Sequence, residues 1–175
     1  MRQQTRSGIS LTSAVAAAIA SLLLAAPAFA QTPPSAERVR GGMFDASDPS
    51  GIARFMEKTG YRVELGVAVN GDPVISGRIS RTDYVIQFYE CESGAFCNSI
   101  QLVARATKPA AFSYETANTF NSRWRYVRLT VDQNQIKLQM DVNLDAGVTA
   151  DNLEDTLDIW RQLLEIFERD ILGLK

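Results

Sequence analysis

The stretch YVRLTVDQNQIKLQMD, residues 126–141, decides the fold because apolar and polar residues alternate on both sides of one turn. A two-residue turn at Gln133-Asn134 predicts an antiparallel hairpin. Its apolar face is expected to pair Val131 with Ile136, Leu129 with Leu138, and Val127 with Met140. Its polar face is expected to pair Thr130 with Lys137, Arg128 with Gln139, and Tyr126 with Asp141. One face of the sheet is therefore buried and the other is open to water.

Four more strands are predicted before this hairpin. Residues 61–69 alternate in polarity, which indicates a half-buried strand, and Asn70-Gly71-Asp72-Pro73 indicates a turn. Strands over 74–80 and 84–90 follow, and a fourth covers 98–106. Gathering apolar side chains on one face fixes the register of the middle pair. That register places Ile79 opposite Tyr84, Gly77 opposite Ile86, and Ile75 opposite Phe88.

Three helices complete the predicted fold. Asp48 and Pro49 begin the first helix and Gly60 ends it, while the second runs from the cap Ser113 to about Arg123. Gly147 and Thr149 introduce a long third helix with one apolar stripe. The stripe consists of Leu153, Leu157, Trp160, Leu164, Phe167 and Ile171. The expected fold class is α+β, an antiparallel sheet of about six strands with helices packed on one face.

The first thirty residues predict the destination of the chain. Arg2 and Arg6 precede an uncharged run over 14–26, and Ala28-Phe29-Ala30 has the small-residue pattern of a signal peptidase site. We expect a cleaved Sec-type signal peptide over 1–30, a flexible linker over 31–46 and one domain over 47–175. An uncleaved membrane anchor is the alternative, but the apolar run is short for a bilayer span. The predicted location is the periplasm or the exterior, with no stable membrane anchor after cleavage.

The composition of the chain excludes or disfavours several classes of function. The chain has 18 basic and 20 acidic residues, so removal of Arg2 and Arg6 leaves 16 basic residues against 20 acidic ones, a net charge of −4. This balance disfavours nucleic acid as a partner. The chain has no histidine, which excludes Ser-His-Asp and Cys-His catalysis and most zinc sites. Carboxylate, Ser-Lys and calcium chemistry stay open, but we expect no enzyme, no cofactor and no metal site.

Cys91 and Cys97 are the two cysteines of the chain. In an oxidising compartment they predict an intrachain disulfide that ties a hairpin together. Their spacing is not the C-x-x-C of redox enzymes. A structural disulfide is the favoured interpretation, and thiol-disulfide exchange is the alternative.

Several short motifs together resemble the YbjN family of bacterial sensory transduction regulators. They are Cys97 with Ile100-Gln101, Asn118-x-Phe120-Asn121-x3-Arg125-Tyr126, Asp132, Met140-Asp141-Val142, and Gly147-Val148-Thr149 before a helix that carries tryptophan. The resemblance covers roughly residues 48–171. It implies an α+β fold similar to that of type III secretion chaperones, and a non-catalytic domain. Family members usually have Trp at Phe120 and Phe at Tyr126, changes that keep an aromatic ring.

The candidate functional residues form a possible interaction patch: Asn118, Asn121, Arg125, Tyr126, Arg128 and Asp141. A purely structural role for the same residues is the alternative. Asparagine and arginine can bind the free carbonyl groups at a helix end, and Asp141 can form a cross-strand pair. We expect a protein-binding or regulatory module that uses its open sheet face to bind an unknown protein partner or to self-associate. The alternative is a histidine-free periplasmic enzyme or a thiol-disulfide exchange protein that uses Cys91 and Cys97.

Overall fold

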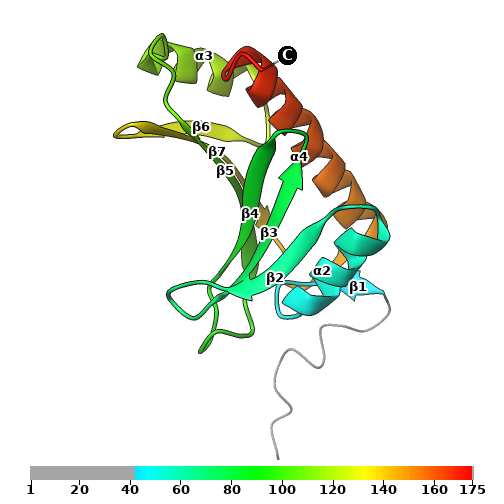
Figure 1. Cartoon of the computed structure of the whole chain (residues 1–175). Helices are drawn as coiled ribbons and strands as arrows, with labels where there is room; N and C mark the ends of the chain where they lie inside the picture. The colour runs from blue at the N-terminus through cyan, green and yellow to red at the C-terminus, as the bar shows by residue number, and fades with distance from the viewer. Residues whose placement is uncertain (1–41, 175) are drawn as a thin grey trace, which may run out of the picture. The chain divides into compact units, whose positions relative to one another are not determined.

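The structure, a computed structural model, describes residues 42–174 (Figure 1). The chain divides into the units Met1–Gln31 and Thr32–Lys175, and every described residue belongs to the second. The predicted signal peptide and the linker residues 31–41 lie outside the described residues. The elements are β1 (Met43–Phe44), α2 (Pro49–Lys58), β2 (Val63–Val67), β3 (Pro73–Ile79), β4 (Thr82–Tyr89), β5 (Ser99–Thr107), α3 (Tyr114–Arg123), β6 (Arg128–Asp132), β7 (Gln135–Asn143), β8 (Val148–Thr149) and α4 (Ala150–Asp170).

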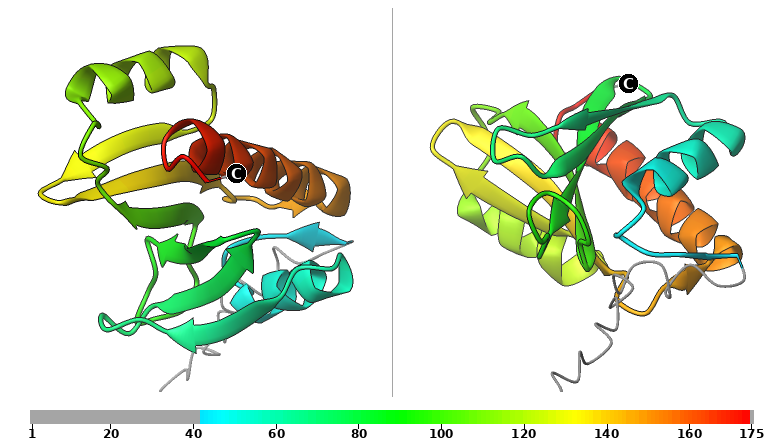
Figure 2. Two further views of the ribbon diagram at one scale, coloured as in Figure 1. Left: turned by 45° about the horizontal axis from the view of Figure 1, so that its top comes forward. Right: turned by 90° about the horizontal axis from the view of Figure 1, so that it is seen from below.

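A six-stranded antiparallel sheet with strand order β2-β3-β4-β5-β7-β6 forms the centre of the described region. The long helix α4 lies against one face of this sheet (Figure 2). Trp160 and Phe167 of α4 are fully buried and join one core cluster with residues of α2, α3 and the strands. The α+β class, with helices on one face of the sheet, is therefore confirmed.

The helix starts follow the predicted capping chemistry. The Asp48 side chain accepts a hydrogen bond from the Gly51 N–H, which satisfies one of the free donors at the start of α2. Ser113 caps α3 and Thr149 caps α4 in the same manner. The stripe predicted on α4 is buried from Leu153 to Phe167, as its spacing of three and four residues requires.

The β6–β7 hairpin confirms four of the six predicted pairs. Leu129 lies opposite Leu138, Val131 opposite Ile136, Thr130 opposite Lys137, and Arg128 opposite Gln139. The two outermost pairs are wrong, because β6 begins only at Arg128. Tyr126 has φ of 69°, a left-handed conformation that cannot continue a strand. Asp141 therefore lies beyond the last β6–β7 pair, and on the other side of β7 it pairs with Gln101 of β5.

The predicted register of β3 with β4 is wrong by two residues. The structure places Ile79 opposite Thr82, Gly77 opposite Tyr84, and Ile75 opposite Ile86. Ser80 adopts φ of 55°, which allows a two-residue turn that is tighter than the four-residue loop expected. Tyr84 lies over Gly77, where an added Cβ would come within 2.7 Å of the ring. A shift of two keeps each side chain on its predicted face, so burial alone does not distinguish the registers.

The linker boundary and the burial of β2 also differ from the prediction. Met43 and Phe44, which composition places in the linker, pair with Thr149 and Val148, and Ala46 is buried. The folded region therefore includes residues 43–46. Strand β2 is the second case: it is predicted to be half-buried, but the apolar side chains after Val63 are exposed because the core ends there.

Candidate functional site

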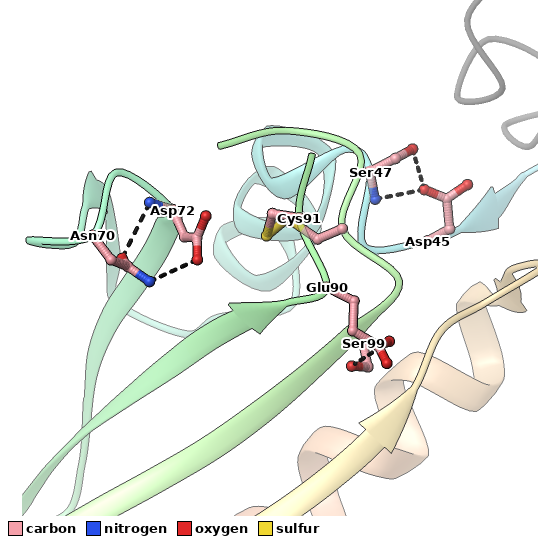
Figure 3. Close-up of a disulfide and its surroundings, with 8 residues drawn as sticks. Asp45, Ser47, Asn70, Asp72, Glu90, Cys91 and Ser99 are labelled. Atoms are coloured by element: carbon pink, nitrogen blue, oxygen red, sulfur yellow. Dashed lines mark hydrogen bonds between the residues drawn. A yellow bond between two sulfur atoms is a disulfide. The ribbon is translucent and has the colours of Figure 1, made fainter. Parts of the chain in front are cut away.

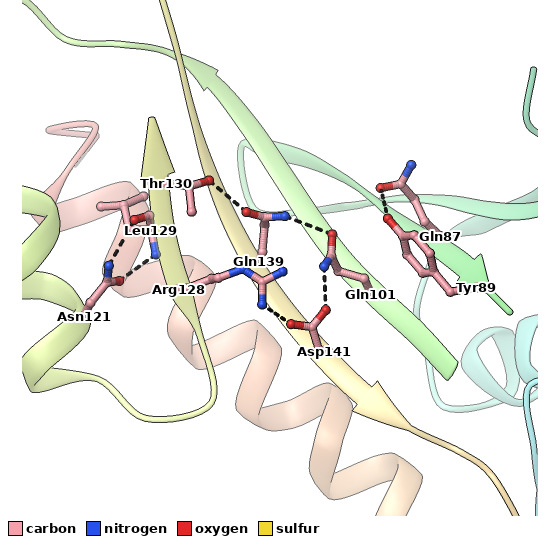
Figure 4. A network of polar contacts seen from close by, with 9 residues as sticks. All are labelled: Gln87, Tyr89, Gln101, Asn121, Arg128, Leu129, Thr130, Gln139 and Asp141. Atoms are coloured by element: carbon pink, nitrogen blue, oxygen red, sulfur yellow. Dashed lines mark hydrogen bonds and ion pairs between the residues drawn. The ribbon is translucent and has the colours of Figure 1, made fainter. Parts of the chain in front are cut away.

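The face of the sheet that points away from the core carries a chain of polar side chains, drawn in Figure 4. We call it the open face. Thr130 donates a hydrogen bond from Oγ1 to Oε1 of Gln139 at 2.8 Å, and Nε2 of Gln139 donates to Oε1 of Gln101 at 3.0 Å. Nε2 of Gln101 in turn donates to Oδ1 of Asp141 at 2.5 Å. Arg128 completes the array by an ion pair with Oδ2 of Asp141.

Strand order brings this array together from three strands. Gln101 lies on β5, Gln139 and Asp141 on β7, and Arg128 and Thr130 on β6. Because side chains alternate along a strand, Gln101 and Val103 point away from the buried Leu102. They are nevertheless only 7% and 1% exposed. Neighbouring side chains on the open face therefore cover both of them.

Two carboxyl groups of the hairpin, those of Asp141 and Asp132, have lowered pKa values. Burial of Asp141 acts to raise its pKa, but hydrogen bonds from Gln101 and Arg128 outweigh burial and hold that pKa below its usual value. A hydrogen bond from Lys137, 2.8 Å away, likewise lowers the pKa of Asp132. Both carboxyl groups are thus anionic near neutral pH, and each has a cationic neighbour.

Two shallow depressions border the array. One, of about 850 Å³, is lined by Tyr89, Gln101, Gln139 and Asp141 among other residues. The other, of about 590 Å³, has Val85 and Val103 on its wall beside Arg62 and Arg105. The open face thus combines polar groups with open hollows of several hundred cubic ångströms.

The six patch residues expected from the sequence do not come together as one site. Arg128 and Asp141 lie on the open face, whereas Asn121 binds the outer edge of β6: its side chain accepts from the Leu129 N–H at 2.6 Å and donates to the Leu129 carbonyl at 3.1 Å. Asn118 is exposed on α3. Arg125 lies over the ring of the exposed Tyr126, 5.0 Å from its centroid.

Gln101 is the functional candidate that sequence reasoning missed. It lies in a strand whose alternation is predicted correctly and belongs to the Ile100-Gln101 motif, but its local pattern does not indicate that it is buried against a carboxylate. Only the pairing of β5 with β7 places it against Asp141, a residue 40 positions away. Glu168 forms another contact that the sequence does not reveal: its buried carboxylate on α4 accepts hydrogen bonds from Thr82 Oγ1 at 2.6 Å and the Arg81 N–H at 3.0 Å, which joins the helix to the turn between β3 and β4.

Cys91 and Cys97 form a disulfide in the loop between β4 and β5 (Figure 3). Cys97 is 1% exposed and belongs to the core cluster, with Cys91 packed against it. The tip of the same loop contacts the turn between β2 and β3, since a Cβ on Gly94 would lie 2.7 Å from the Gly71 carbonyl oxygen. The disulfide therefore stabilises the loop at one end of the sheet.

Residues 42–174 contain no group of three or more acidic, histidine or cysteine side chains placed to hold a metal ion. Within the same residues no helix combines the length and apolar character needed to cross a bilayer.

Comparison with known proteins identifies the class to which this fold belongs. The family model described as "YbjN: Putative bacterial sensory transduction regulator" matches residues 48–172, and the chain therefore belongs to the YbjN family. Among solved structures, the chain is similar to the crystal structure of YbjN, a putative transcription regulator from E. coli. That similarity has a sequence identity of 12% and a TM-score of 0.47, and it covers 70% of this chain and 93% of the other. No curated protein matches the chain.

Proposed function

We propose that this member of the YbjN family is an exported, non-catalytic binding module of the bacterial periplasm, which acts by holding a protein partner on its open face. The observation that carries the proposal is the hydrogen-bonded array on the open face, in which the buried Gln101 fixes Gln139 and Asp141. The accessible members of the array, Arg128, Gln139 and Asp141, are therefore presented in a fixed arrangement.

The physical advantage of this arrangement is preorganisation. Free glutamine side chains lose rotamer freedom when they bind a ligand, which costs about 0.5–1.5 kcal/mol for each side chain. Gln101 and Gln139 are already held by each other and by neighbouring groups. Binding of a polar peptide surface to Gln139 therefore costs less side-chain entropy than binding to a mobile glutamine would.

The same groups suit proton transfer poorly. A general acid needs a proton to give near neutral pH, and an effective base needs a pKa close to the working pH. The pKa of Asp141 lies below its ordinary value, so this carboxylate stays ionised and is a weak base. Its two oxygens are also engaged by Gln101 and Arg128. These groups therefore support partner binding better than acid–base catalysis.

Thiol-disulfide exchange is the alternative function. It requires a thiolate to reach one sulfur of the disulfide. Cys97 is buried in the core cluster and Cys91 is half-buried. The surroundings favour a structural role for the pair.

Export is tested by the N-terminus of the protein in cell fractions. We expect the protein in the periplasmic fraction with Gln31 as its first residue, because Ala28 and Ala30 flank the predicted cleavage point. Mass spectrometry of the purified protein measures this directly. A cytosolic protein that retains Met1 would contradict the predicted export.

Partner binding is tested by one substitution on the open face and a matched one outside it. Thr130→Lys places an ammonium group beside Gln139, whereas Thr119→Lys makes the same change on the exposed surface of α3. Each variant is cross-linked in intact cells with the leader sequence retained. We expect Thr130→Lys to lose the partners of the wild type and Thr119→Lys to keep them. Equal recovery from both variants would overturn the assignment to the open face.

A further inference from the structure

The outer edge of β2 has unused backbone hydrogen-bonding groups. The Ala68 N–H donates to the Asp72 carbonyl at 2.8 Å, so the even-numbered residues of this strand bond inward to β3. Val67 lies opposite Pro73, which has no N–H to donate. The N–H and C=O groups of Val63, Leu65 and Val67 consequently point outward, and within residues 42–174 no other strand pairs with them.

The side chains along this edge are apolar and exposed. Leu65 is 41% exposed, Val67 is 75% exposed, and Val69 is fully exposed. Proteins usually protect edge strands with lysine, proline, a bulge or a covering element. Strand β2 has neither lysine nor proline, and Glu64 is its one charged residue. The other edge of the sheet differs, because Asn121 occupies the outward groups of Leu129 on β6.

We propose that two copies of this chain pair through their β2 strands, antiparallel and two-fold symmetric about Gly66. This register places Leu65 opposite Val67 of the partner subunit, and Val67 opposite Leu65 of the partner subunit. Glu64 then faces Ala68 of the partner subunit, so no two like charges lie opposite each other. Every outward group of Leu65 and Val67 gains a hydrogen-bonding partner, and the exposed apolar strip is covered by its own copy.

The sequence of β2 fits a second copy of itself because it is self-complementary. At the two-fold axis, Gly66 meets Gly66 of the partner subunit as a non-hydrogen-bonded pair, in which the Cα atoms approach most closely, to about 4.5 Å. A small residue suits that position. The fold of the single chain does not demand glycine there, since an added Cβ would meet no atom nearer than 3.8 Å. The ladder is short, and we expect a dimer that dissociates on dilution.

Sedimentation velocity over about 1 µM to about 1 mM, the range of dissociation constants of weak complexes, tests the proposal. The sample is protein purified after expression of the full chain. We expect a monomer–dimer equilibrium, and we expect Val67→Pro to raise its dissociation constant at least about tenfold. Proline at this position removes an outward N–H that β3 does not use, and the preceding Gly66 lacks the Cβ that proline would disturb. Val67→Ala keeps the N–H and should weaken the dimer less.

A lysine pair keeps the test decisive if the proline variant unfolds. Val67→Lys places a charge in the paired edge, whereas Tyr114→Lys makes the same change at an 81% exposed position on α3. We expect loss of the dimer in the first variant and no change in the second. A wild type that stays monomeric up to about 1 mM would overturn self-pairing. A folded Val67→Lys variant that still dimerises would overturn it as well.

Discussion

Asn121 replaces a neighbouring strand at the outer edge of β6. Its amide both accepts from and donates to the backbone of Leu129, as the backbone of an adjacent strand would do. We expect Asn121→Ala to lower the free energy of unfolding by about 1–2 kcal/mol, because two hydrogen bonds are lost and two backbone groups are left without these partners.

Urea denaturation measures this loss, and Asn118→Ala is the matched control. Asn118 lies on the same helix and is exposed, so its replacement should change stability by less than about 0.5 kcal/mol. Equal effects of the two substitutions would show that the bonds to Leu129 contribute nothing beyond helix propensity.

Tyr84 gives a prediction of opposite sign. Its buried hydroxyl has no hydrogen-bond partner among the described residues, and burial, followed by the nearby Tyr61, raises its pKa far above the ordinary value. We expect Tyr84→Phe to raise the free energy of unfolding by up to about 1 kcal/mol at pH 7.

The same substitution should also change the alkaline limb of the stability curve. Between the ordinary tyrosine pKa of about 10 and the raised folded-state pKa, the unfolded chain loses the proton that the folded chain keeps. Stability therefore falls as the pH rises above about 10, and Tyr84→Phe should make that fall shallower. Thermal melts at pH 7 and pH 11 measure the difference, and parallel curves for both proteins would contradict it.

At the scale of elements, the disulfide loop supports the end of the sheet. Replacing Cys91 and Cys97 together by Ala should lower the free energy of unfolding by about 2 kcal/mol, the chain-entropy value for so short a loop. Binding through the open face should persist, because four of the five array residues lie on β6 and β7, and Gln101 on β5 is held by hydrogen bonds to Gln139 and Asp141. Melting temperature and partner recovery are measured side by side. Unchanged stability with lost binding would contradict the structural role.

The strands show which part of the pairing local sequence can predict. The turn at Gln133-Asn134 leaves one register for β6 and β7, and four predicted pairs are correct. The turn after Ile79 allowed two registers with the same buried face, and the tighter one is present. Alternation in β2 indicates a strand but does not reveal that the core stops at Val63, since that depends on where α2 and α4 lie.

At the scale of the whole molecule, acidic groups set the response to low pH. A hydrogen bond from Lys137 lowers the pKa of Asp132, and one from Arg169 lowers that of Asp170. The pKa of Asp141 is also lowered, because the hydrogen bonds from Gln101 and Arg128 outweigh its burial. A depressed folded-state pKa stabilises the protein above the unfolded-state value of about 4. Stability should therefore be lost as the pH falls below about 4.

Asp141→Asn tests the share of this loss that arises on the open face. The variant should be less stable than the wild type at pH 6, and the difference should shrink as the pH falls through 4 toward 2, because the wild-type carboxylate is then protonated. Chemical denaturation across this range measures it. A difference that does not depend on pH would show that Asp141 contributes through shape rather than charge.

The whole fold is easier to predict than the site. Element types, caps and the buried face follow from local periodicity, and the family resemblance agrees with them. The open-face array depends on the order β5-β7-β6, which no local pattern specifies, so Gln101 and Asp141 meet only in the folded chain. The division of the predicted patch between the open face and the edge of β6 has the same cause.

The amide of Asn121 also limits how far sheets of neighbouring molecules can join. Linear polymers of β-proteins grow when each molecule offers two bare edges, one for the molecule ahead and one for the molecule behind. Here the backbone groups of Leu129, on one of the two edges, are occupied by a side chain of the same molecule. Asn121 therefore hinders strand addition at β6, and we expect concentrated solutions of the native protein to stay free of fibrils.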